Sequence, residues 1–360
     1  MKSKKILIHG SINTANFGDV LFAEMFFNYI KDNNLGEPHF LATSRIGISD
    51  YVRKYISYYD VFKLKDIKKA SLIVFMSGGY LGDSNKSIRG SLTRWGKYPF
   101  VYLIARFHRV PVVVCGVGGG PLYHWFNRMF FCSLLKYAKF VTVRDEQTKE
   151  YFETLGVKNK INSTTDSAIL LTDKTFQCLD SKVKEELHNA IGDKKKLYIH
   201  VPHTQHIIDG YKKELIPAIN QFIAEHPEFG VVFITDEQHG IPINLIESVD
   251  TKYKYVYHYT YPDQLCAFLS LADVVVTAKL HVGIISASFG ISVISFPLHQ
   301  HKTWRFYAQI NETDRSVPFS EMTQETVLHQ LNKYYNMPIT ISSELRTKAA
   351  QNLSIIQNAL

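Results

Sequence analysis

The sequence predicts an α/β protein of two Rossmann-like, doubly wound domains facing a cleft. Three observations predict this class: β-branched runs alternate with helical segments, the alternation restarts after a charged segment at Thr172–Lys196, and glycine-containing loops follow several strands. Such alternation is typical of a parallel sheet with helices on both faces. A chain of 360 residues has room for two such domains. We expect them at residues 1–178 and 195–360, with helices closing the second.

The first half opens with a predicted strand at Lys5–His9, a glycine-containing loop and a helix from Val20 to Ile30. The G-x-G-x-x-G fingerprint of dinucleotide-binding domains is absent. Glycine loops follow later strands at Ser77–Asp83 and Gly116–Pro121, where the missing Cβ lets the backbone approach a ligand or another segment closely. The further strands expected from apolar, β-branched runs are His39–Thr43, Ser71–Met76, Val110–Cys115, Phe140–Val143 and Ile161–Thr165.

The second half restarts the pattern and ends in amphipathic helices beyond Phe319. A helix of small residues from about Val282 joins its last two strands, and Gly290 suits the C-terminal cap of that helix. Two strands joined by one helix form a right-handed βαβ unit. The strands expected in this half are Lys196–Val201, Val231–Thr235, Tyr255–His258, Ala272–Ala278 and Ile291–Phe296.

Cationic and imidazole side chains follow both strands of this βαβ unit. Lys279 and His281 lie between the first strand and the helix, and Lys302 and Arg305 follow the second strand. Ligands of open parallel sheets bind outside the carboxyl ends of the strands, where a helix N-terminus also attracts anions. We therefore expect an anion-handling site with His281 as its acid or base. The alternatives are a histidine that only bonds backbone and cations that are merely solvated.

Candidate residues of the first domain also lie at strand ends. Arg144 directly follows a strand, and a salt bridge within its own helix start is the alternative use. Asn16, Asp19 and Asp83 could bind sugar hydroxyls or serve as a base, although Asp19 could equally cap the helix that follows. The glycines expected to lie against substrate are Gly79, Gly118 and Gly119.

The composition restricts the classes of ligand and partner that we expect. A net charge of +8 and a pI near 9.0 favour an acidic ligand, a phosphate-bearing substrate or an anionic membrane surface. No helix has a dense Lys/Arg row and no nucleic-acid motif is present, so nucleic acid is not an expected partner. No metal is expected at His200, His203 and His206, because residues three apart on a strand point to opposite faces. His200 and His203 could instead line the cleft.

The sequence also bears on location. Four widely spaced cysteines in apolar surroundings are typical of reduced intracellular thiols. The N-terminal apolar run is too short for a signal peptide, and no run approaches the ~18 residues needed to span a bilayer. We expect a cytoplasmic protein. The basic, aromatic stretches Tyr98–Phe107 and Trp125–Phe140 could lie peripherally at the inner face of the membrane, with core packing as the alternative.

The order of motifs resembles the polysaccharide pyruvyl transferase family over roughly residues 5–310. The similar pieces are Asn16-Phe-Gly-Asp19, the Gly78-Gly79 loop reaching Asp83, Gly116–Pro121, Val143-Arg-Asp-Glu146 with Leu155-Gly-Val157, Asp166-Ser-Ala168, Leu271-Ala-Asp273 to His281, and Gly290 to Phe296. The resemblance implies a GT-B-like fold. It also implies transfer of the enolpyruvyl carbons of phosphoenolpyruvate onto two hydroxyls of one sugar, giving a cyclic pyruvate ketal and free phosphate.

The resemblance assigns roles to particular residues. The family's arginine after the strand falls on Arg144, its R-x-H histidine on His281 and its downstream lysine on Lys302. Lys279 stands where the family has arginine, and lysine lacks the bidentate fork. We expect His281 to protonate C3 of phosphoenolpyruvate, and Arg144 and Lys302 to hold its two anionic groups.

The same resemblance implies that phosphoenolpyruvate is a co-substrate and that no cofactor takes part. The expected acceptor is a sugar, on a lipid-linked oligosaccharide of capsule or surface-polymer synthesis. Two alternatives remain open. A GT-B glycosyltransferase would hold the diphosphate of a nucleotide sugar with the same basic loops. A non-catalytic basic module would bind anionic glycans at the membrane surface without forming a covalent product.

Overall fold

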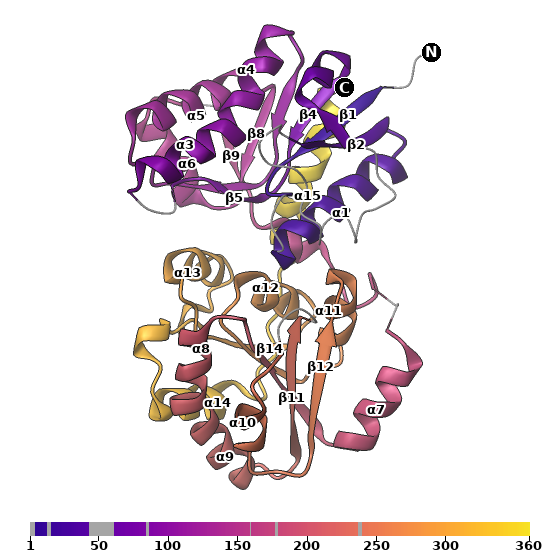
Figure 1. Cartoon of the computed structure of the whole chain (residues 1–360), viewed down its shortest axis with the longest axis vertical. Helices are drawn as coiled ribbons and strands as arrows, with labels where there is room; N and C mark the ends of the chain where they lie inside the picture. The colour runs from indigo at the N-terminus through magenta and orange to yellow at the C-terminus, as the bar shows by residue number, and fades with distance from the viewer. Residues whose placement is uncertain are drawn as a thin grey trace. The chain divides into compact units, whose positions relative to one another are not determined.

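The computed structural model describes residues 4–12, 16–42, 61–83, 86–158, 160–176, 179–236 and 240–360. The chain forms two compact units, Met1–Ser167 with Ser343–Leu360, and Ala168–Ser342 (Figure 1). Each unit has its own parallel sheet and its own apolar core. Two expected domains therefore correspond to two units, but their bounds differ from residues 1–178 and 195–360. The first unit ends earlier along the chain and then regains the last helix.

The sheet of the first unit has the strand order β3-β2-β1-β4-β6-β8-β9, with every pair parallel. Starting from β1, the strands β2 and β3 extend the sheet on one side. The strands β4, β6, β8 and β9 extend it on the other side. The direction reverses between β1 and β4, which is the position where doubly wound sheets bind ligands. The strands are β1 (Lys5–His9), β2 (Glu37–Ala42), β3 (Val61–Lys63), β4 (Leu72–Phe75), β6 (Val112–Val114), β8 (Phe140–Val143) and β9 (Ile161–Ser163).

Helices cover this sheet, as expected for parallel strands that are buried on both faces. β4 illustrates the pattern, because all of its side chains are buried and all are apolar. The helical segments are α1 (Phe17–Asp32), η1 (Leu64–Lys69), α3 (Ile88–Lys97), α4 (Pro99–Phe107), α5 (Trp125–Tyr137), α6 (Glu146–Thr154) and α15 (Ser343–Ala359).

The C-terminal helix α15 packs against β6 and β8 of the first unit (Figure 1). Its Asn352 is fully buried, donates to Thr165 O at 2.9 Å and accepts from Thr164 Oγ1 at 2.7 Å. The expectation that the closing helices all belong to the second domain is therefore wrong for α15. An amphipathic pattern indicates that a helix packs on another element but does not identify that element. Here the buried amide of Asn352 ties the helix to the first unit.

The two glycine loops are not loops throughout. They contain the short strands β5 (Gly78–Leu81) and β7 (Val117–Gly119), which pair in parallel beyond the ends of β4 and β6. Gly116 has φ +62, a left-handed conformation that favours glycine and redirects the chain from β6 into β7. The glycines therefore let two segments of the protein approach each other.

The start of α1 also differs from the prediction. The helix begins at Phe17 and not at Val20, because the Asn16 side chain accepts a hydrogen bond from Gly18 N at 3.0 Å. Asparagine is among the preferred N-cap residues. Asp19 therefore lies in the first turn and does not cap the helix.

The second unit has the strand order β12-β11-β10-β13-β14, again with every pair parallel. Its direction reverses between β10 and β13. The strands are β10 (Lys195–His200), β11 (Phe229–Asp236), β12 (Lys254–Tyr259), β13 (Val274–Thr277) and β14 (Ser292–Ser295). The helical segments are α7 (Ser181–Ile191), α8 (Gln205–Gly210), η3 (Tyr211–Leu215), α9 (Ile216–Glu225), α10 (Ile243–Glu247), α11 (Pro262–Leu269), α12 (Leu280–Ser288), α13 (Gln300–Gln309), η4 (Thr313–Arg315), η5 (Phe319–Glu321) and α14 (Gln324–Tyr334). A short η2 (Ser167–Leu170) lies at the division between the units.

A π-helical turn, η3, interrupts the run from α8 to α9. Ile216 N donates to Tyr211 O, a bond that spans five residues where an α-helix spans four. Pro217 follows directly and has no N–H to donate, so the regular ladder cannot continue across it. This turn places the ring of Tyr211 in the core, fully buried.

Cys115, Cys132 and Cys266 are buried free thiols, and Cys178 lies outside the described residues, as does Thr43 at the predicted end of a strand. Across the described ranges, every helix is too short or too polar to cross a bilayer.

Candidate active site

The turn between β13 and α12 carries Lys279 and His281. Lys279 is the N-cap residue of α12 and is exposed, and His281 lies in the first turn, half-buried. Thr277 Oγ1 accepts from Lys279 N at 3.0 Å and so fixes the end of the strand. The side chain of Lys279 does not cap this helix, and the first turn has no acidic residue. Backbone N–H groups at such a helix start favour an anion.

Lys302 and Arg305 lie three residues apart on α13 and so share one face of that helix. Their helix, like α12, has no acidic residue in its first turn. The pKa of His299, the residue before α13, is lowered by burial and by the positive charges of Lys302 and Lys279. The second unit thus brings Lys279 and Lys302 to the same edge, at the ends of β13 and β14.

His200 closes the central strand β10 at this same edge. Only 4% of the residue is exposed. Both ring nitrogens lack a hydrogen-bond partner within the described part of the chain. Tyr211 Oη donates to the His200 carbonyl at 3.4 Å, so the π-helical turn supports the strand end. Buried polar groups without partners are rare in folded proteins and concentrate at functional sites.

The sequence placed His200 where it could line the cleft but assigned it no catalytic or binding role, because its position at a strand end is the only signal for it. A histidine at the end of a buried strand can equally be a core residue without a function. Burial, and to a smaller extent the positive charge of Lys279, lowers its pKa to about 3. The imidazole is therefore neutral at neutral pH, beside the charge of Lys279.

Buried neutral histidines should make the protein sensitive to acid. Burial lowers the pKa of His9 in the first unit to about 4 and that of His200 to about 3, whereas unfolded histidine titrates near 6.5. Between these values the unfolded chain binds more protons, so the free energy of unfolding falls as pH falls below about 6.5. Each histidine should contribute up to about 1.4 kcal/mol per pH unit.

Urea unfolding from pH 7.5 down to about pH 5 tests this expectation. The slope should become shallower in His200→Leu. The exposed His258 offers a matched control, because His258→Leu should keep the slope of the unmodified protein. An unchanged slope in His200→Leu would mean that the ring is already protonated in the folded state.

Arg144 follows β8 and is nearly buried, with 8% of its side chain exposed. Its Nη1 lies 3.4 Å from Asp166 Oδ2, and its Nε lies 3.8 Å from Asp145 Oδ2. A Cβ at Gly118 would lie 2.4 Å from Nε, so this glycine makes room for the guanidinium. The salt bridge at its own helix start is present, and Asp166 adds a second one. Together these contacts fix the direction of the guanidinium.

Gly119 packs against protein in the same way. A Cβ there would lie 2.8 Å from Leu81 O, and its N–H donates to Thr148 Oγ1 at 3.0 Å. Gly79 lies within β5. Substrate contacts at these glycines stay a prediction, and the contacts present explain glycine without them.

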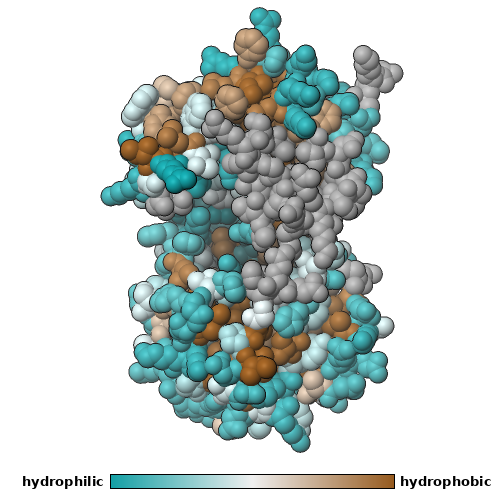
Figure 2. Space-filling model, viewed as in Figure 1, coloured by the Kyte–Doolittle hydropathy of each residue, from teal (hydrophilic) through white to brown (hydrophobic). Residues whose placement is uncertain are grey.

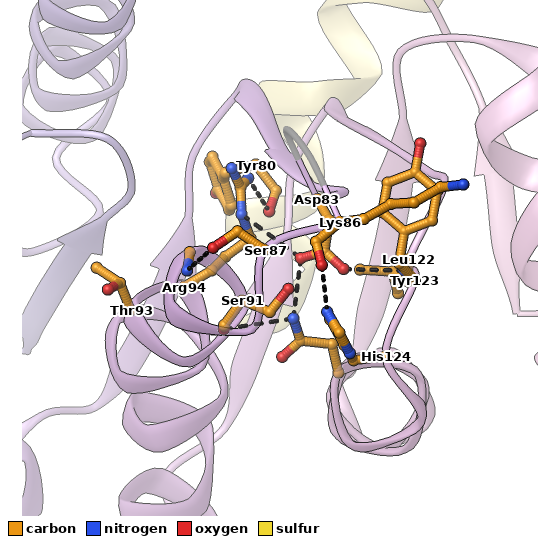
Figure 3. A network of polar contacts seen from close by, with 12 residues as sticks. Tyr80, Asp83, Lys86, Ser87, Ser91, Thr93, Arg94, Leu122, Tyr123 and His124 are labelled. Carbon is orange, nitrogen blue, oxygen red and sulfur yellow. Dashed lines mark hydrogen bonds and ion pairs between the residues drawn. The ribbon is translucent and has the colours of Figure 1, made fainter.

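Asp83 lies in a buried polar network that joins α3 and α5 (Figure 3). Its side chain is 1% exposed and accepts from Tyr123 N at 3.0 Å and Asn127 Nδ2 at 2.9 Å. Arg94 Nε lies 4.0 Å away. This carboxylate has protein partners on several sides, which is the structural use of such a residue.

Asp83→Ala should therefore destabilise the first unit. Asn127 and the Tyr123 N–H would lose their acceptor inside the protein, which we expect to cost about 2–4 kcal/mol. Asp173→Ala, at an exposed position, is the control and should change little. Thermal unfolding of both variants provides the measurement, and equal melting temperatures would contradict the structural role.

Asn16 and Asp19 follow β1 in the first unit. The strand order of the sheet reverses next to this strand, between β1 and β4. Asn16 is exposed and caps α1, and Asp19 is half-buried in the first turn. Burial raises the pKa of Tyr98 to about 12, and the negative charge of Asp19 contributes to the rise. A Cβ at Gly78 would lie 3.5 Å from Asp19 Oδ1. Asp19 is thus next to β5, the strand that carries Gly79.

A model of one protein family, described as polysaccharide pyruvyl transferase, matches residues 16–300. The chain belongs to the polysaccharide pyruvyl transferase family. The match covers both the first-unit motifs and the βαβ unit with His281, and it confirms the resemblance inferred from the order of motifs. No curated protein matches the chain.

Solved structures similar to this family member include enzymes of other classes. UDP-GlcNAc 2-epimerase from Methanocaldococcus jannaschii has a TM-score of 0.68 at 11% identity, covering 99% of each chain. The Neisseria meningitidis enzyme bound to UDP-GlcNAc has a TM-score of 0.66 at 11% identity, also covering 99% of each chain. The spinosyn forosaminyltransferase SpnP has a TM-score of 0.55 at 10% identity, covering 100% of this chain and 96% of that one. At such identities the likeness concerns the fold, and it confirms the GT-B-like α/β class.

The carboxyl edge of the second-unit sheet in this family member has a definite chemical character. It combines one half-buried imidazole, a helix start without acidic residues and at least two lysines. Within the described ranges, no cluster of three or more His, Cys, Asp or Glu side chains could hold a metal ion. Such an edge can bind an anion and exchange a proton with it.

Proposed function

We propose that the protein transfers the enolpyruvyl group of phosphoenolpyruvate onto two hydroxyls of one sugar, forming a cyclic pyruvate ketal during surface-polysaccharide synthesis. Membership of the family supports polysaccharide pyruvylation in general. The observation that most supports this donor is the position of His281, in the first turn of α12 beside Lys279. Phosphoenolpyruvate carries a carboxylate and a phosphate, so it requires several cations and benefits from a helix N-terminus.

In the proposed first step His281 gives a proton to C3 of phosphoenolpyruvate. The methylene becomes a methyl group, and C2 becomes electrophilic. One sugar hydroxyl attacks C2 and loses its proton, which restores the protonated imidazole. The bond from C2 to the phosphate oxygen then breaks, and the second hydroxyl attacks C2 to close the ketal. The proton of that hydroxyl leaves with the phosphate.

The cations have the task of stabilising negative charge as phosphate departs. Lys302 is exposed on α13 and can reach a ligand without rearrangement of the core. Arg144, assigned by the family pattern, is held by Asp145 and Asp166 and presents a planar fork suited to a carboxylate. Lys279 would act as a point charge, because it lacks that fork. The scheme requires no cofactor beyond the co-substrate itself.

The acceptor hydroxyls are assigned to the first unit. Of the two carboxylates expected there, we favour Asp19 over Asp83, because Asp83 is enclosed by protein donors and Asp19 is half-buried. The acceptor we expect is a sugar of a lipid-linked oligosaccharide.

A panel of sugar acceptors incubated with phosphoenolpyruvate tests the proposal by mass spectrometry. An acceptor that gains the mass of one pyruvate ketal, with release of one phosphate, is the expected result. Consumption of phosphoenolpyruvate without any modified sugar would contradict acceptor transfer. Unchanged phosphoenolpyruvate with every acceptor, where binding of glycans persists, would favour a non-catalytic glycan-binding module.

A glycosyltransferase that uses a nucleotide sugar is the second candidate. The neighbours whose titles name UDP or UDP-GlcNAc favour it, because they share this fold. The basic edge would then hold a diphosphate. Release of free nucleoside diphosphate from UDP-sugars in the same acceptor panel, with phosphoenolpyruvate left unchanged, would select this candidate over pyruvyl transfer.

A further inference from the structure

Large apolar side chains are exposed at the N-terminal ends of α3 and α5. Trp125 is 72% exposed and Ile88 is 61% exposed. Each has an exposed apolar neighbour four residues later, on the same helix face. Figure 2 shows hydrophobic surface interspersed with hydrophilic surface over this part of the first unit. We call this surface the α3–α5 patch; its apolar members are Ile88, Leu92, Tyr123, Trp125 and Met129.

The polar network of Asp83 makes the two helix ends one surface (Figure 3). His124 Nε2 lies 3.1 Å from Lys86 O, and Asn127 Nδ2 donates to Ser91 O at 3.4 Å. Lys86 Nζ lies over the Tyr123 ring, 5.8 Å from its centroid. Trp95 of α3 also contacts Phe130 of α5, with ring centroids 5.5 Å apart. The exposed apolar rows of α3 and α5 are therefore held side by side.

The charge of this part of the chain is of one sign. Residues 84–144 contain ten Lys or Arg and no Asp or Glu. Removing these ten from the 41 basic residues of the chain leaves 31, against 33 acidic residues. The net positive charge of the protein thus resides in this segment. Lys86, Arg89 and Arg128 are exposed within or beside the patch.

We propose that the α3–α5 patch docks the protein on an anionic phospholipid surface. Tryptophan and tyrosine favour the headgroup level of a bilayer, where their rings are partly apolar and partly polar. Basic residues around them are attracted to anionic lipid. A segment without a single carboxylate complements a uniformly negative surface, whereas a protein partner usually presents both signs. The patch lies within the first unit and docks independently of the pyruvyl transfer proposed above.

Binding to vesicles tests this docking with the full-length protein. Vesicles of phosphatidylcholine alone are compared with vesicles that also contain phosphatidylglycerol, and the bound fraction is measured by co-sedimentation. We expect binding to the second kind only. Salt should weaken it, because the screening length falls from about 10 Å at 0.1 M to about 3 Å at 1 M.

Variants separate the apolar and electrostatic parts. Leu92→Ser with Trp125→Ser should weaken binding at least tenfold, because the apolar anchors are lost. Lys86→Glu with Arg89→Glu should weaken it by about fivefold for each basic residue removed, and by more for reversal. The control Ile243→Ser with Lys184→Glu changes an equally exposed apolar residue and a lysine of the second unit, and should bind as the unmodified protein does.

Three results would overturn the docking surface: equal binding to neutral vesicles, patch variants that bind like the unmodified protein, or a dimer that Trp125→Ser dissociates in light scattering. The last would assign the patch to a second copy of the chain. Circular dichroism of each variant verifies folding. Phosphate release from phosphoenolpyruvate with a soluble acceptor should be unchanged in the patch variants, so a failure of the proposed function is recognised separately.

Discussion

Replacing His281 with alanine should abolish phosphate release from phosphoenolpyruvate while leaving the fold intact. The ring lies in the first turn of α12, where alanine is well tolerated in a helix. Loss of a general acid typically costs a factor of about 10²–10⁴ in rate. Because Lys279, Lys302 and the helix start remain, binding of phosphoenolpyruvate should change much less than turnover.

Turnover and binding must therefore be measured separately, by phosphate release and by calorimetric titration of phosphoenolpyruvate. His299→Ala is the matched control, since His299 lies at the same edge and near the same lysines. We expect it to keep most of the activity. Turnover near the unmodified rate in His281→Ala would remove this histidine from the mechanism, whatever the control shows.

Arg144→Met should reduce both stability and activity, and a second substitution should separate the two effects. Removing the guanidinium leaves the carboxylates of Asp145 and Asp166 nearly buried without their cation. Breaking a buried pair in this way costs about 3–5 kcal/mol. Adding Asp166→Asn removes one of those charges, so the double variant should recover part of the lost stability.

Activity should not recover with stability. In the proposed mechanism the guanidinium holds an anionic group of phosphoenolpyruvate, and neither variant restores it. Arg144→Lys keeps the charge but not the fork, and should remain at least tenfold slower than the unmodified protein. Urea unfolding and phosphate release on the same preparations provide the test. A double variant with recovered turnover would show that Arg144 serves only as a salt-bridge partner.

Much of the fold could be predicted because strands of a buried parallel sheet have a plain signature. The strands Lys5–His9 and Phe140–Val143 were predicted with the bounds that β1 and β8 have. Both are short apolar runs ended by a polar residue or glycine. The start of α1 was predicted three residues late, because the Asn16 cap depends on a side-chain bond and not on periodicity. The strands β5 and β7 were missed, since glycine-rich segments carry no apolar alternation.

Some features of the candidate site could likewise be predicted from the sequence, and others could not. The rule that ligands meet the carboxyl ends of parallel strands brought Lys279, His281 and Lys302 to one edge from sequence alone. It could not distinguish Asp83, which is at a strand end too but is enclosed by Tyr123 and Asn127. It allowed His200 to line the cleft but could not show that both of its ring nitrogens lack a hydrogen-bond partner among the described residues, because that depends on three-dimensional packing.

Local periodicity and motif order were sufficient to predict the class of fold, the family and the sheet edge on which the basic residues gather. Three features became visible only in the folded protein: α15 packs on the first sheet through Asn352, Gly118 accommodates Arg144, and the exposed rows of α3 and α5 form one surface. Those outcomes depend on contacts between residues far apart in the chain. A local pattern predicts that a side chain will be buried, but the residues that it contacts depend on how the elements pack.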